Sequence, residues 1–412
     1  MLEYTPQDVE TIVKNELNQS LETLLREGAR RMLQAALEME VDQYVSQCQA
    51  QRDQNGHRQV VRNGHHPERE LVSGVGKIPV RQPRVDDRRP DRRFTSAILP
   101  KYMRRLPSID QLIPALYLKG VSTSSFPEAL KAILGEQVSG LSPANIVRLK
   151  TIWETEFADW QKRDLSGKHY VYVWADGIYF GVRLSADRPC ILVLIGATSD
   201  GRKELVGLLD GHRESKLSWQ SLLEDLKARG LSTAPAIAVG DGALGFWAAL
   251  REAWPQTAEQ RCWVHKTANV LDKLPKRIQP DAKKLLQDMY LAPTEKEALE
   301  TYDRFICRYE DKYPKACECL IKDKEVLFTF YTFPAAHWRH LRTTNPIEST
   351  FGTVRHRTRQ TKGCGSRTAT MTMVFKLALE AQKKWQRLHS YKYLEKVIDG
   401  VPFVDGEMKM VA

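Results

Sequence analysis

The sequence lacks the features of a membrane or secreted protein. No apolar run approaches the roughly 18 residues that a membrane-spanning helix needs. The first residues, Met1 to Pro6, do not form a signal-peptide pattern. Cysteine is scarce, with 7 in 412 residues, and a scattered, odd set fits reduced thiols better than a disulfide framework. We therefore expect a cytoplasmic protein with no membrane partner.

The chain is also short of acidic residues, with 51 against 62 lysines and arginines and a net charge of +11. Residues 52–105 hold fourteen basic and six acidic residues, so this segment carries +8 of the total. Such an excess suggests a polyanionic partner. Alternating pieces at 70–72 and 77–80 predict a small β-ribbon. We interpret the segment as a basic ribbon lying along DNA phosphates, and a solvated linker is the alternative. Its candidate DNA-binding residues are Arg88, Arg89, Arg92 and Arg93.

Helical patterns precede and follow this ribbon. Between residues 7 and 45 apolar residues recur at three- and four-residue intervals, which predicts one or two helices. Their apolar stripe packs either on the body of the protein or on a second copy. In residues 106–165, Ser142 and Pro143 offer an N-cap and a first-turn proline for a helix. Together with a preceding helix that ends at Gly135, this region resembles a helix-turn-helix, although any helical bundle gives the same pattern.

From residue 169 the pattern changes to strands. Runs of β-branched, aromatic and other apolar residues alternate with amphipathic helices and with turns or breaks. We expect such turns or breaks at Gly177, at 187–189 and at 199–201. The expected strands are His169–Trp174, Tyr179–Leu184, Cys190–Thr198, Ala236–Val239 and Gln260–Val264. Three strands, helix, strand, helix, strand is the order of the ribonuclease H-like fold, an α/β fold with a mixed five-stranded sheet. In that order the first and fourth strands are neighbours at the centre of the sheet.

Carboxylates stand at informative places in this scheme. Asp176 follows the apolar run 171–174, and Asp241 lies between two glycines after the fourth strand. Because the two strands are expected to be neighbours, these side chains would meet. A third acid, Glu348, is the only one in residues 339–368, which hold seven basic residues. The alternative for Glu348 is a structural one, in which it completes a capping box with Asn345 as the N-cap.

Three carboxylates brought together suit phosphodiester chemistry. Cleavage needs an activated nucleophile, a stabilised leaving oxygen and an offset for charge on the phosphate, and two metal ions about 4 Å apart supply all three. Mg²⁺ is a hard cation that prefers oxygen ligands and takes few carboxylates. We predict that Asp176 bridges two Mg²⁺ ions, for which Mn²⁺ can substitute, and that Asp241 and Glu348 each hold one side.

At this point the chain resembles the Mutator-type transposases of bacterial insertion sequences, which belong to the Asp-Asp-Glu superfamily. The resemblance extends over nearly the whole sequence. Its most specific motifs are Ala175–Gly177, Gly240–Gly242, Gln260–Lys266 and Arg342–Glu348, and Leu134–Ser142 resembles the DNA-binding region of the family. The resemblance implies that Asp176, Asp241 and Glu348 are the metal-binding triad. It also implies double-stranded DNA as partner, at terminal inverted repeats and target sites, and a homodimer or higher oligomer on that DNA.

The resemblance assigns roles to further residues. Cys262 and His265 match a Cys/Asp-x-x-His pair that supports the site, and an ordinary buried pair is the alternative. Trp338 matches a tryptophan that stacks on DNA, and a core tryptophan is the alternative. The basic residues grouped with them as DNA-binding candidates are Arg342, Arg355 and Arg359.

The sequence thus predicts an insertion-sequence transposase that cleaves DNA and transfers strands with Mg²⁺, and that acts at the bacterial nucleoid. A ribonuclease H-like structure-specific endonuclease or resolvase, or a catalytically silent DNA-binding repressor, are the alternatives. The expected segments are an N-terminal helical region 1–50, a basic ribbon 51–105, a helical DNA-binding region 106–165, a first part of the catalytic core 166–265, an all-α insertion 266–337, a second part of the core 338–390 and a tail 391–412.

Overall fold

The computed structural model describes residues 21–90, 92–106, 116, 143–179, 190–211, 213–348, 352 and 367–409. The chain divides into two compact units, Met1–Val147 and Arg148–Ala412. We describe each by itself. The finer seven-part division expected from the sequence stays a prediction.

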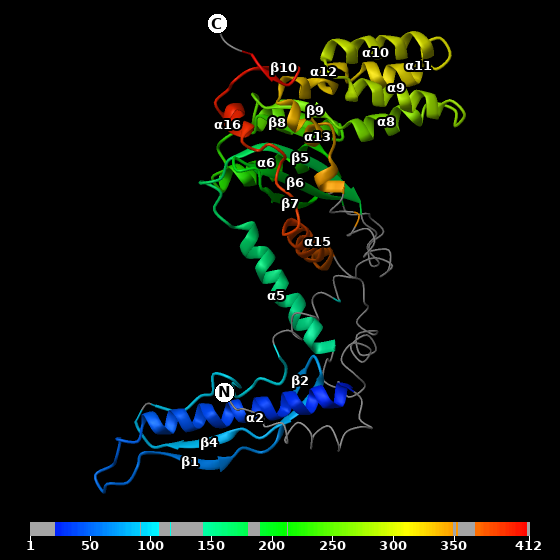
Figure 1. Cartoon of the computed structure of the whole chain (residues 1–412). Helices are drawn as coiled ribbons and strands as arrows, with labels where there is room; N and C mark the ends of the chain where they lie inside the picture. Colours follow the sequence, from blue (N-terminus) through cyan, green and yellow to red (C-terminus); the bar gives the residue numbers. More distant parts are fainter. Residues whose placement is uncertain are drawn as a thin grey trace. The chain divides into compact units, whose positions relative to one another are not determined.

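Unit 1 combines one long helix with two antiparallel ladders. Strand β1 (Val60–His65) pairs with β4 (Pro83–Asp87), and β2 (Arg69–Ser73) pairs with β3 (Gly76–Val80). The expected β-ribbon is therefore present. Helix α2 (Leu21–Gln47) lies along these strands (Figure 1).

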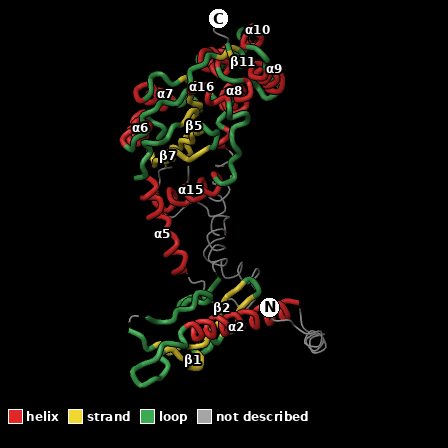
Figure 2. Tube along the Cα trace, turned by 60° about the vertical axis from the view of Figure 1, so that its left-hand side comes forward, coloured by secondary structure: helices red, strands yellow, loops and turns green. Residues whose placement is uncertain are grey.

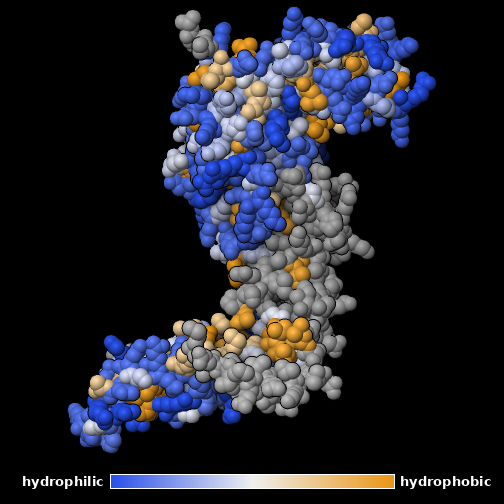
Figure 3. Space-filling model, viewed as in Figure 1, coloured by the Kyte–Doolittle hydropathy of each residue, from blue (hydrophilic) through white to orange (hydrophobic). Residues whose placement is uncertain are grey.

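The helix and the ladders share a small core. Leu37 of α2 is buried with Leu71, Ile78, Val80 and Leu99. Alternation along β3 turns every second side chain inward, which is why Ile78 and Val80 both face the helix. Of the two alternatives for the N-terminal stripe, this part of it packs on the body of its own chain. The described surface of unit 1 that is visible in Figure 3 is largely hydrophilic, with hydrophobic patches on it.

Helix α5 (Pro143–Gln161) begins at the proline expected to occupy its first turn. The helix expected before it, which would complete a helix-turn-helix, lies outside the described residues. The end of α5 packs on α15 (Arg367–Gln382), where the ring of Phe375 lies 5.1 Å from that of Phe157 and 5.2 Å from that of Trp160.

The centre of unit 2 is a mixed five-stranded sheet, as expected. Its strands lie in the order β7-β6-β5-β8-β9. Neighbours β7, β6 and β5 are antiparallel, whereas β5, β8 and β9 are parallel. Strand β5, which carries Asp176, therefore pairs with β8, the strand that Asp241 follows, as expected. The strands are β5 (Tyr170–Tyr179), β6 (Cys190–Thr198), β7 (Lys203–Gly211), β8 (Ile237–Gly240) and β9 (Ala258–Arg261).

Three details of the strand prediction were wrong. Gly177 was expected to break the first strand, but β5 continues through it, paired with Leu192. Strand β7 was not expected at all. The last strand ends at Arg261 rather than at residue 264, because helix α8 (Trp263–Leu271) begins two residues after Arg261. Of the strand expected at 179–184, Tyr179 ends β5 and the rest lies outside the described residues.

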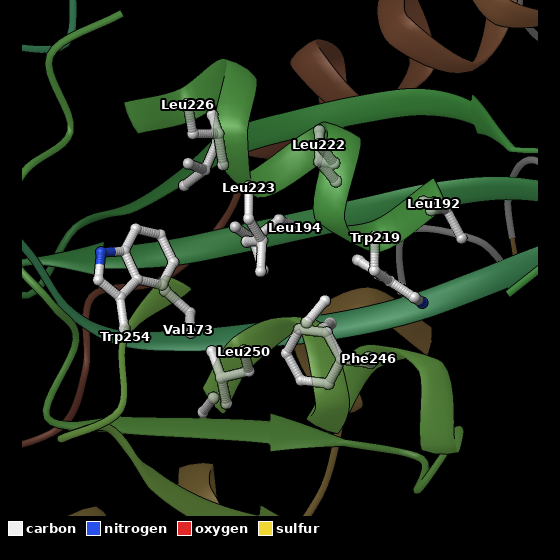
Figure 4. Close-up of a cluster of buried hydrophobic side chains, with 14 of the residues drawn as sticks. Val173, Leu192, Leu194, Trp219, Leu222, Leu223, Leu226, Phe246, Leu250 and Trp254 are labelled. Atoms are coloured by element: carbon white, nitrogen blue, oxygen red, sulfur yellow. The ribbon is translucent and has the colours of Figure 1, made fainter. Parts of the chain in front are cut away.

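The two faces of β5 have different partners. Val173 and Ala175 face a core built with α6 (Lys216–Ala228) and α7 (Leu244–Ala253), where Trp219 and Phe246 are buried (Figure 4). Successive side chains of a strand point to opposite faces. Tyr172, Trp174 and Asp176 therefore share the other face.

A group of helices separates β9 from Glu348 in the chain. Helices α8, α9 and α10 lie beside one another, and the C-terminal hairpin lies close by, with Asp405 accepting a hydrogen bond from Glu295 N at 2.7 Å (Figure 2). No helix among the described residues is both long and apolar enough to cross a membrane. The remaining elements are α9 (Gln279–Leu291), α10 (Glu295–Tyr309), α11 (Pro314–Ile321), α12 (Lys324–Leu327), η1 (Thr329–Thr332), η2 (Ala335–His337), α13 (Trp338–Leu341), α16 (Tyr393–Ile398), β10 (Phe403–Val404) and β11 (Glu407–Met408).

Candidate active site

Strand β5 anchors the segment that leads to Glu348. The Tyr172 hydroxyl donates to His337 Nδ1 at 2.8 Å, since His337 Nε2 lies 3.2 Å from the Ser390 carbonyl and donates there. Two residues along the same face, Trp174 Nε1 donates to the His340 carbonyl at 2.9 Å. The next residue on that face is Asp176. The alternation of the strand therefore places this carboxylate on the side where residues 337–340 are attached.

Asp176 and Asp241 come together where the parallel ladder of β5 and β8 ends. Ala175 is paired with Gly240, so the two acids are the next residues along neighbouring strands. Asp241 Oδ1 accepts a hydrogen bond from Ala243 N at 2.9 Å, which closes a tight turn. Gly242 in that turn has φ +89°, and a Cβ there would meet the Arg261 guanidinium. Only glycine fits the turn without displacing Arg261.

Asp176 is the most enclosed of these acids. It is 7% exposed, and burial followed by the nearby charge of Asp241 raises its pKa to about 6. The charge of Glu348 acts in the same direction, while His265 and a hydrogen bond from Gly177 N oppose it. The charge of Asp241 disfavours a second negative charge on Asp176, so this position favours a nearby cation.

Glu348 reaches the site because the start of α8 binds the turn before it. Trp263 N donates to the Arg342 carbonyl at 2.9 Å, and Cys262 Sγ accepts from both N and Oγ1 of Thr344 at 3.4 Å. Glu348 Oε1 accepts from Thr344 Oγ1 at 3.2 Å and lies 3.9 Å from His265 Nδ1. These contacts bring Glu348 to the residues that follow β9.

The capping-box alternative for Glu348 is wrong. Glu348 N donates to the Thr344 carbonyl at 3.1 Å, so Thr344 precedes the helix and Asn345 is already inside it. A capping box also needs the glutamate to accept from the backbone N–H of the N-cap. That N–H of Thr344 goes to the Cys262 sulfur instead.

Cys262 and His265 form a tight group with Glu348. One donor atom from each of the three residues lies within 4.8 Å of the others. A hydrogen bond with Cys262 raises the pKa of His265 to about 9, although burial opposes it. Burial acts to raise the pKa of the Cys262 thiol, but its contacts with His265 and Thr344 outweigh burial and lower it. The protonated imidazole is therefore favoured beside the carboxylates.

The donor set suits a divalent metal ion. The oxygen ligands available from Asp176, Asp241 and Glu348 are those that hard cations such as Mg²⁺ prefer. The group of Cys262, His265 and Glu348 has the softer donors that suit other divalent metals.

A fourth carboxylate, Glu214, was missed by the sequence reasoning. It lies in the connection between β7 and α6, and burial raises its pKa to about 7, with contributions from Asp241 and Asp176. Its carboxyl carbon lies 2.3 Å from the place where a Cβ on Gly177 would be. A single glutamate in a polar turn has no local pattern that marks it. The nearest signal was the glycine directly after Asp176.

Two DNA-binding candidates of unit 2 are enclosed by aromatic rings. Trp338 is 7% exposed, and its indole N–H donates to the Phe333 carbonyl at 2.8 Å. The Arg342 guanidinium lies over the rings of Phe330 and Trp338, at 4.7 and 5.1 Å. This placement favours the core alternative for Trp338. Arg355 and Arg359 lie outside the described residues.

The four arginine candidates of unit 1 differ in environment. The Arg89 side chain is only 10% exposed and binds Asp87 at 2.6 Å, so its charge is used within the protein. Arg88 is exposed and lies 2.9 Å from Asp86. Arg92 and Arg93 are exposed. Binding of DNA by these residues stays a prediction, and Arg89 is the one whose environment argues against it.

A mixed sheet with carboxylates gathered where two parallel strands end defines an α/β protein with a candidate metal-ion site. The family model described as "Transposase, Mutator family" matches residues 2–388. The chain belongs to the Mutator family of transposases, and it is therefore an enzyme.

Known relatives agree with this assignment. The chain is 49% identical over 286 residues to the transposase for insertion sequence element IST2 of Acidithiobacillus ferrooxidans, covering 68% of this chain and 94% of the relative. It is 47% identical over 300 residues to the transposase for IS6120 of Mycolicibacterium smegmatis, covering 73% and 92%. A more distant relative, the transposase for ISRM5 of Rhizobium meliloti, is 27% identical over 369 residues, covering 89% and 90%. The protein is thus a transposase of insertion sequences.

Proposed function

We propose that this transposase binds the terminal inverted repeats of its element, cleaves DNA at the element's ends and joins the freed 3′-hydroxyl to new DNA. Its catalytic domain would be ribonuclease H-like, and Asp176, Asp241 and Glu348 would be its metal ligands. The assembly would be a homodimer or higher oligomer on paired ends, at the nucleoid. Unit 1 would supply much of the contact with double-stranded DNA.

One observation carries the proposal. Asp176 and Asp241 follow the last pair of the β5–β8 ladder, and the Cys262–Thr344 contacts hold Glu348 beside His265, near enough for its charge to act on the pKa of Asp176. The carboxylates come from two strands and a helix that are far apart in sequence. A merely structural acid would be paired with a base, whereas among the described residues Asp176 forms no ion pair.

Each residue has a role in the proposed reaction. Two Mg²⁺ ions, or Mn²⁺ in their place, would supply an activated nucleophile and offset charge on the reacting phosphate. Asp176, enclosed on the sheet face, fixes the point on which the other ligands converge. The turn at Gly242 holds Asp241, and Thr344 positions Glu348. His265 supports Glu348 and adds positive charge where DNA phosphates would lie.

A strand-transfer assay tests the proposal. The substrate is a labelled duplex carrying the element's end, read from the inverted repeats that flank the gene. With Mg²⁺ the full chain should nick this duplex and join it to a second DNA. Asp176→Asn should abolish both products while duplex binding remains. Asp281→Asn, a change at a well-exposed acid of α9, is the matched control and should leave both products in place.

The assay also separates the alternatives. Nicked product without joined product, under conditions that allow joining, would replace the proposal with a structure-specific endonuclease or resolvase. Binding with no cleavage by the unaltered chain in Mg²⁺ or Mn²⁺ would replace it with a DNA-binding repressor. Unchanged cleavage by Asp176→Asn would refute the assignment of the site.

A further inference from the structure

Unit 1 contains a groove whose lining includes few of the DNA-binding residues expected from the sequence. It has a volume of about 730 Å³ and lies between strand β4 and residues 93–101. Basic side chains line it from both sides, namely His66, Arg69, Arg84, Arg93 and Lys101. Only one of these, Arg93, was among the DNA-binding residues expected.

The acids of this groove are already neutralised by the protein. Asp86 pairs with Arg88 at 2.9 Å, and Asp87 pairs with Arg89 at 2.6 Å and accepts from the Tyr44 hydroxyl at 2.8 Å. In contrast, the cations of the lining form no ion pair with any carboxylate among the described residues. These four are Arg69, Arg84, Arg93 and Lys101. The groove therefore has a net positive charge that nothing in its walls offsets.

The walls of the groove are fixed in place. The Arg69 guanidinium donates to the carbonyls of Leu99 and Pro100, at 3.3 and 3.1 Å, and Gln82 donates to Leu99 at 3.2 Å. Glu40 of α2 accepts from Ala97 N at 2.6 Å. Residues 97–100 are thus attached to both the strands and the helix, so the groove is formed before any ligand binds.

We propose that this groove is a binding site for the sugar-phosphate backbone of duplex DNA, with Arg84, Arg93 and Lys101 as the residues that contact phosphates. The inference rests on the proposed function and narrows its DNA contacts to one surface. Arg69 serves as a positioning residue, because its donors are used on backbone carbonyls. Arg88 and Arg89 serve to neutralise the two acids, which leaves the lining cations free for the ligand.

Fluorescence anisotropy of a labelled 30-base-pair duplex tests this site in the full chain. Each phosphate contact contributes about 0.9 to the slope of log affinity against log salt, so Arg84→Ala/Arg93→Ala/Lys101→Ala should lower that slope by about 3. At 0.1 M salt the affinity should fall by at least about tenfold. The control is Arg52→Ala/Arg58→Ala/Arg81→Ala, which removes three exposed cations of the same unit from outside the groove.

The two triple variants decide the outcome. A larger loss of affinity and of slope in the groove variant supports the site. Equal losses in both variants, or none in either, overturn it. If the unaltered chain does not bind the duplex at all, it is the proposed function that fails, and not only its assignment to this groove.

An independent observation concerns Glu214. Its carboxyl group packs against the backbone of Gly177, beside Asp176, in the space that a side chain at 177 would occupy. The backbone of residues 214–216 is equally close to Gly245 at the start of α7, so the position of Glu214 is fixed from two sides. The Tyr179 side chain acts to lower the pKa of this carboxylate, against the effect of burial. Among the described residues no lysine, arginine or histidine forms an ion pair with it.

We infer that Glu214 is a fourth carboxylate of the metal-ion site, which rests on the proposed function of the other three. A half-buried carboxylate without a cationic partner carries a desolvation cost that a nearby cation would offset. Glu214 packs against Gly177 of β5, the residue after Asp176, and the charges of Asp241 and Asp176 both act to raise its pKa. Glu214 would therefore add a carboxylate oxygen to the donors that Asp176 and Asp241 offer to a cation.

Binding of Mn²⁺ to the full chain, followed by the electron paramagnetic resonance signal of free Mn²⁺, tests this role without an activity readout. Glu214→Gln, which keeps the shape of the side chain, should weaken Mn²⁺ binding by about tenfold or more, as loss of a metal-site group does. Glu224→Gln on the exposed side of α6 is the control and should bind as the unaltered chain does.

Asp176→Asn distinguishes a failure of the role of Glu214 from a failure of the whole proposed metal-ion site. If it weakens Mn²⁺ binding and Glu214→Gln does not, the role of Glu214 is refuted and the proposed site stands. If neither change affects Mn²⁺ binding, the proposed site itself is refuted. Circular dichroism of each variant checks that the fold is retained.

Discussion

An enclosed carboxylate of unit 1, Asp87, and one on the sheet of unit 2, Asp176, have pKa values shifted in opposite directions. The Asp87 side chain is 2% exposed, and the hydrogen bond from Arg89 lowers its pKa well below the usual range. Asp176 is 7% exposed, and burial beside Asp241 raises its pKa to about 6. Arg89 pairs with the first carboxylate, whereas among the described residues no base forms an ion pair with the second. Such perturbed, unpaired groups mark functional sites.

The largest effect is expected on DNA cleavage when one of the unpaired carboxylates of unit 2 is replaced. Asp241→Asn keeps the turn, because Asn can still accept from Ala243 N, but it removes the charge of a proposed metal ligand. Cleavage of the element-end duplex should fall by at least about 10³-fold, since several kcal/mol of charge stabilisation is lost in the transition state. Duplex affinity measured by anisotropy should stay unchanged. Normal cleavage rates would show that Asp241 is structural.

The second prediction is that replacing Asp176 raises the stability of the folded protein. The pKa of Asp176 in the folded state is above the unfolded value near 3.8, so folding binds a proton more tightly and stability falls as pH rises from about 4 to about 6. Asp176→Asn removes this cost. In buffer with EDTA at pH 8 it should raise the free energy of unfolding by up to about 3 kcal/mol.

Urea unfolding at pH 8 and at pH 4 measures this gain. It should be present at pH 8 and much smaller at pH 4, where the folded carboxyl group is protonated and that of the unfolded chain is partly protonated. Asp225→Asn, at an exposed acid of α6, should show no such pH dependence. A gain that is equal at both pH values would contradict the burial and repulsion described for Asp176.

The third prediction concerns the residue that supports the group. His265→Ala removes the imidazole beside Glu348 and Cys262, and loss of such a supporting group should reduce cleavage by about 10–100-fold. Single-turnover cleavage rates measure the effect. His57→Ala in unit 1 is the control. A loss as complete as that of Asp241→Asn would make His265 a member of the catalytic group.

The smallest effect is expected for the paired carboxylate of unit 1, Asp87. Arg89→Ala leaves Asp87 enclosed without its partner and should lower the melting temperature, whereas Arg88→Ala at the more exposed pair should change it little. Because the folded pKa of Asp87 is lowered, the contribution of this pair is present at neutral pH and is lost as pH falls below the usual carboxyl range. Scanning fluorimetry at pH 7 and pH 3 tests both statements.

The sequence predicted the parts of the site that depend on strand patterns. The expected limits of β6 match the structure, and the pairing of β5 with β8 follows from the order of strands and helices. Gly177 was read as a break because glycine usually weakens a strand. Here it continues the strand, and its missing side chain makes room for Glu214.

What the sequence could not supply depends on tertiary contacts. Trp338 and Arg342 lie in a basic stretch, yet their burial is decided by Phe330 and Phe333, which no local pattern links to them. Strand β7 was missed although the turn before it was expected. Glu214 stands in a polar connection, and only the folded sheet brings it to Asp176 and Asp241.

The most direct test of the central claim concerns Glu348, the acid that local structure explains least. The measurement is the amount of joined product formed from an element-end duplex by Glu348→Gln, with Glu325→Gln of α12 as control. The account predicts that Glu348→Gln binds the duplex but forms no joined product, while the control joins normally. Joining by Glu348→Gln at the level of the unaltered chain would contradict it.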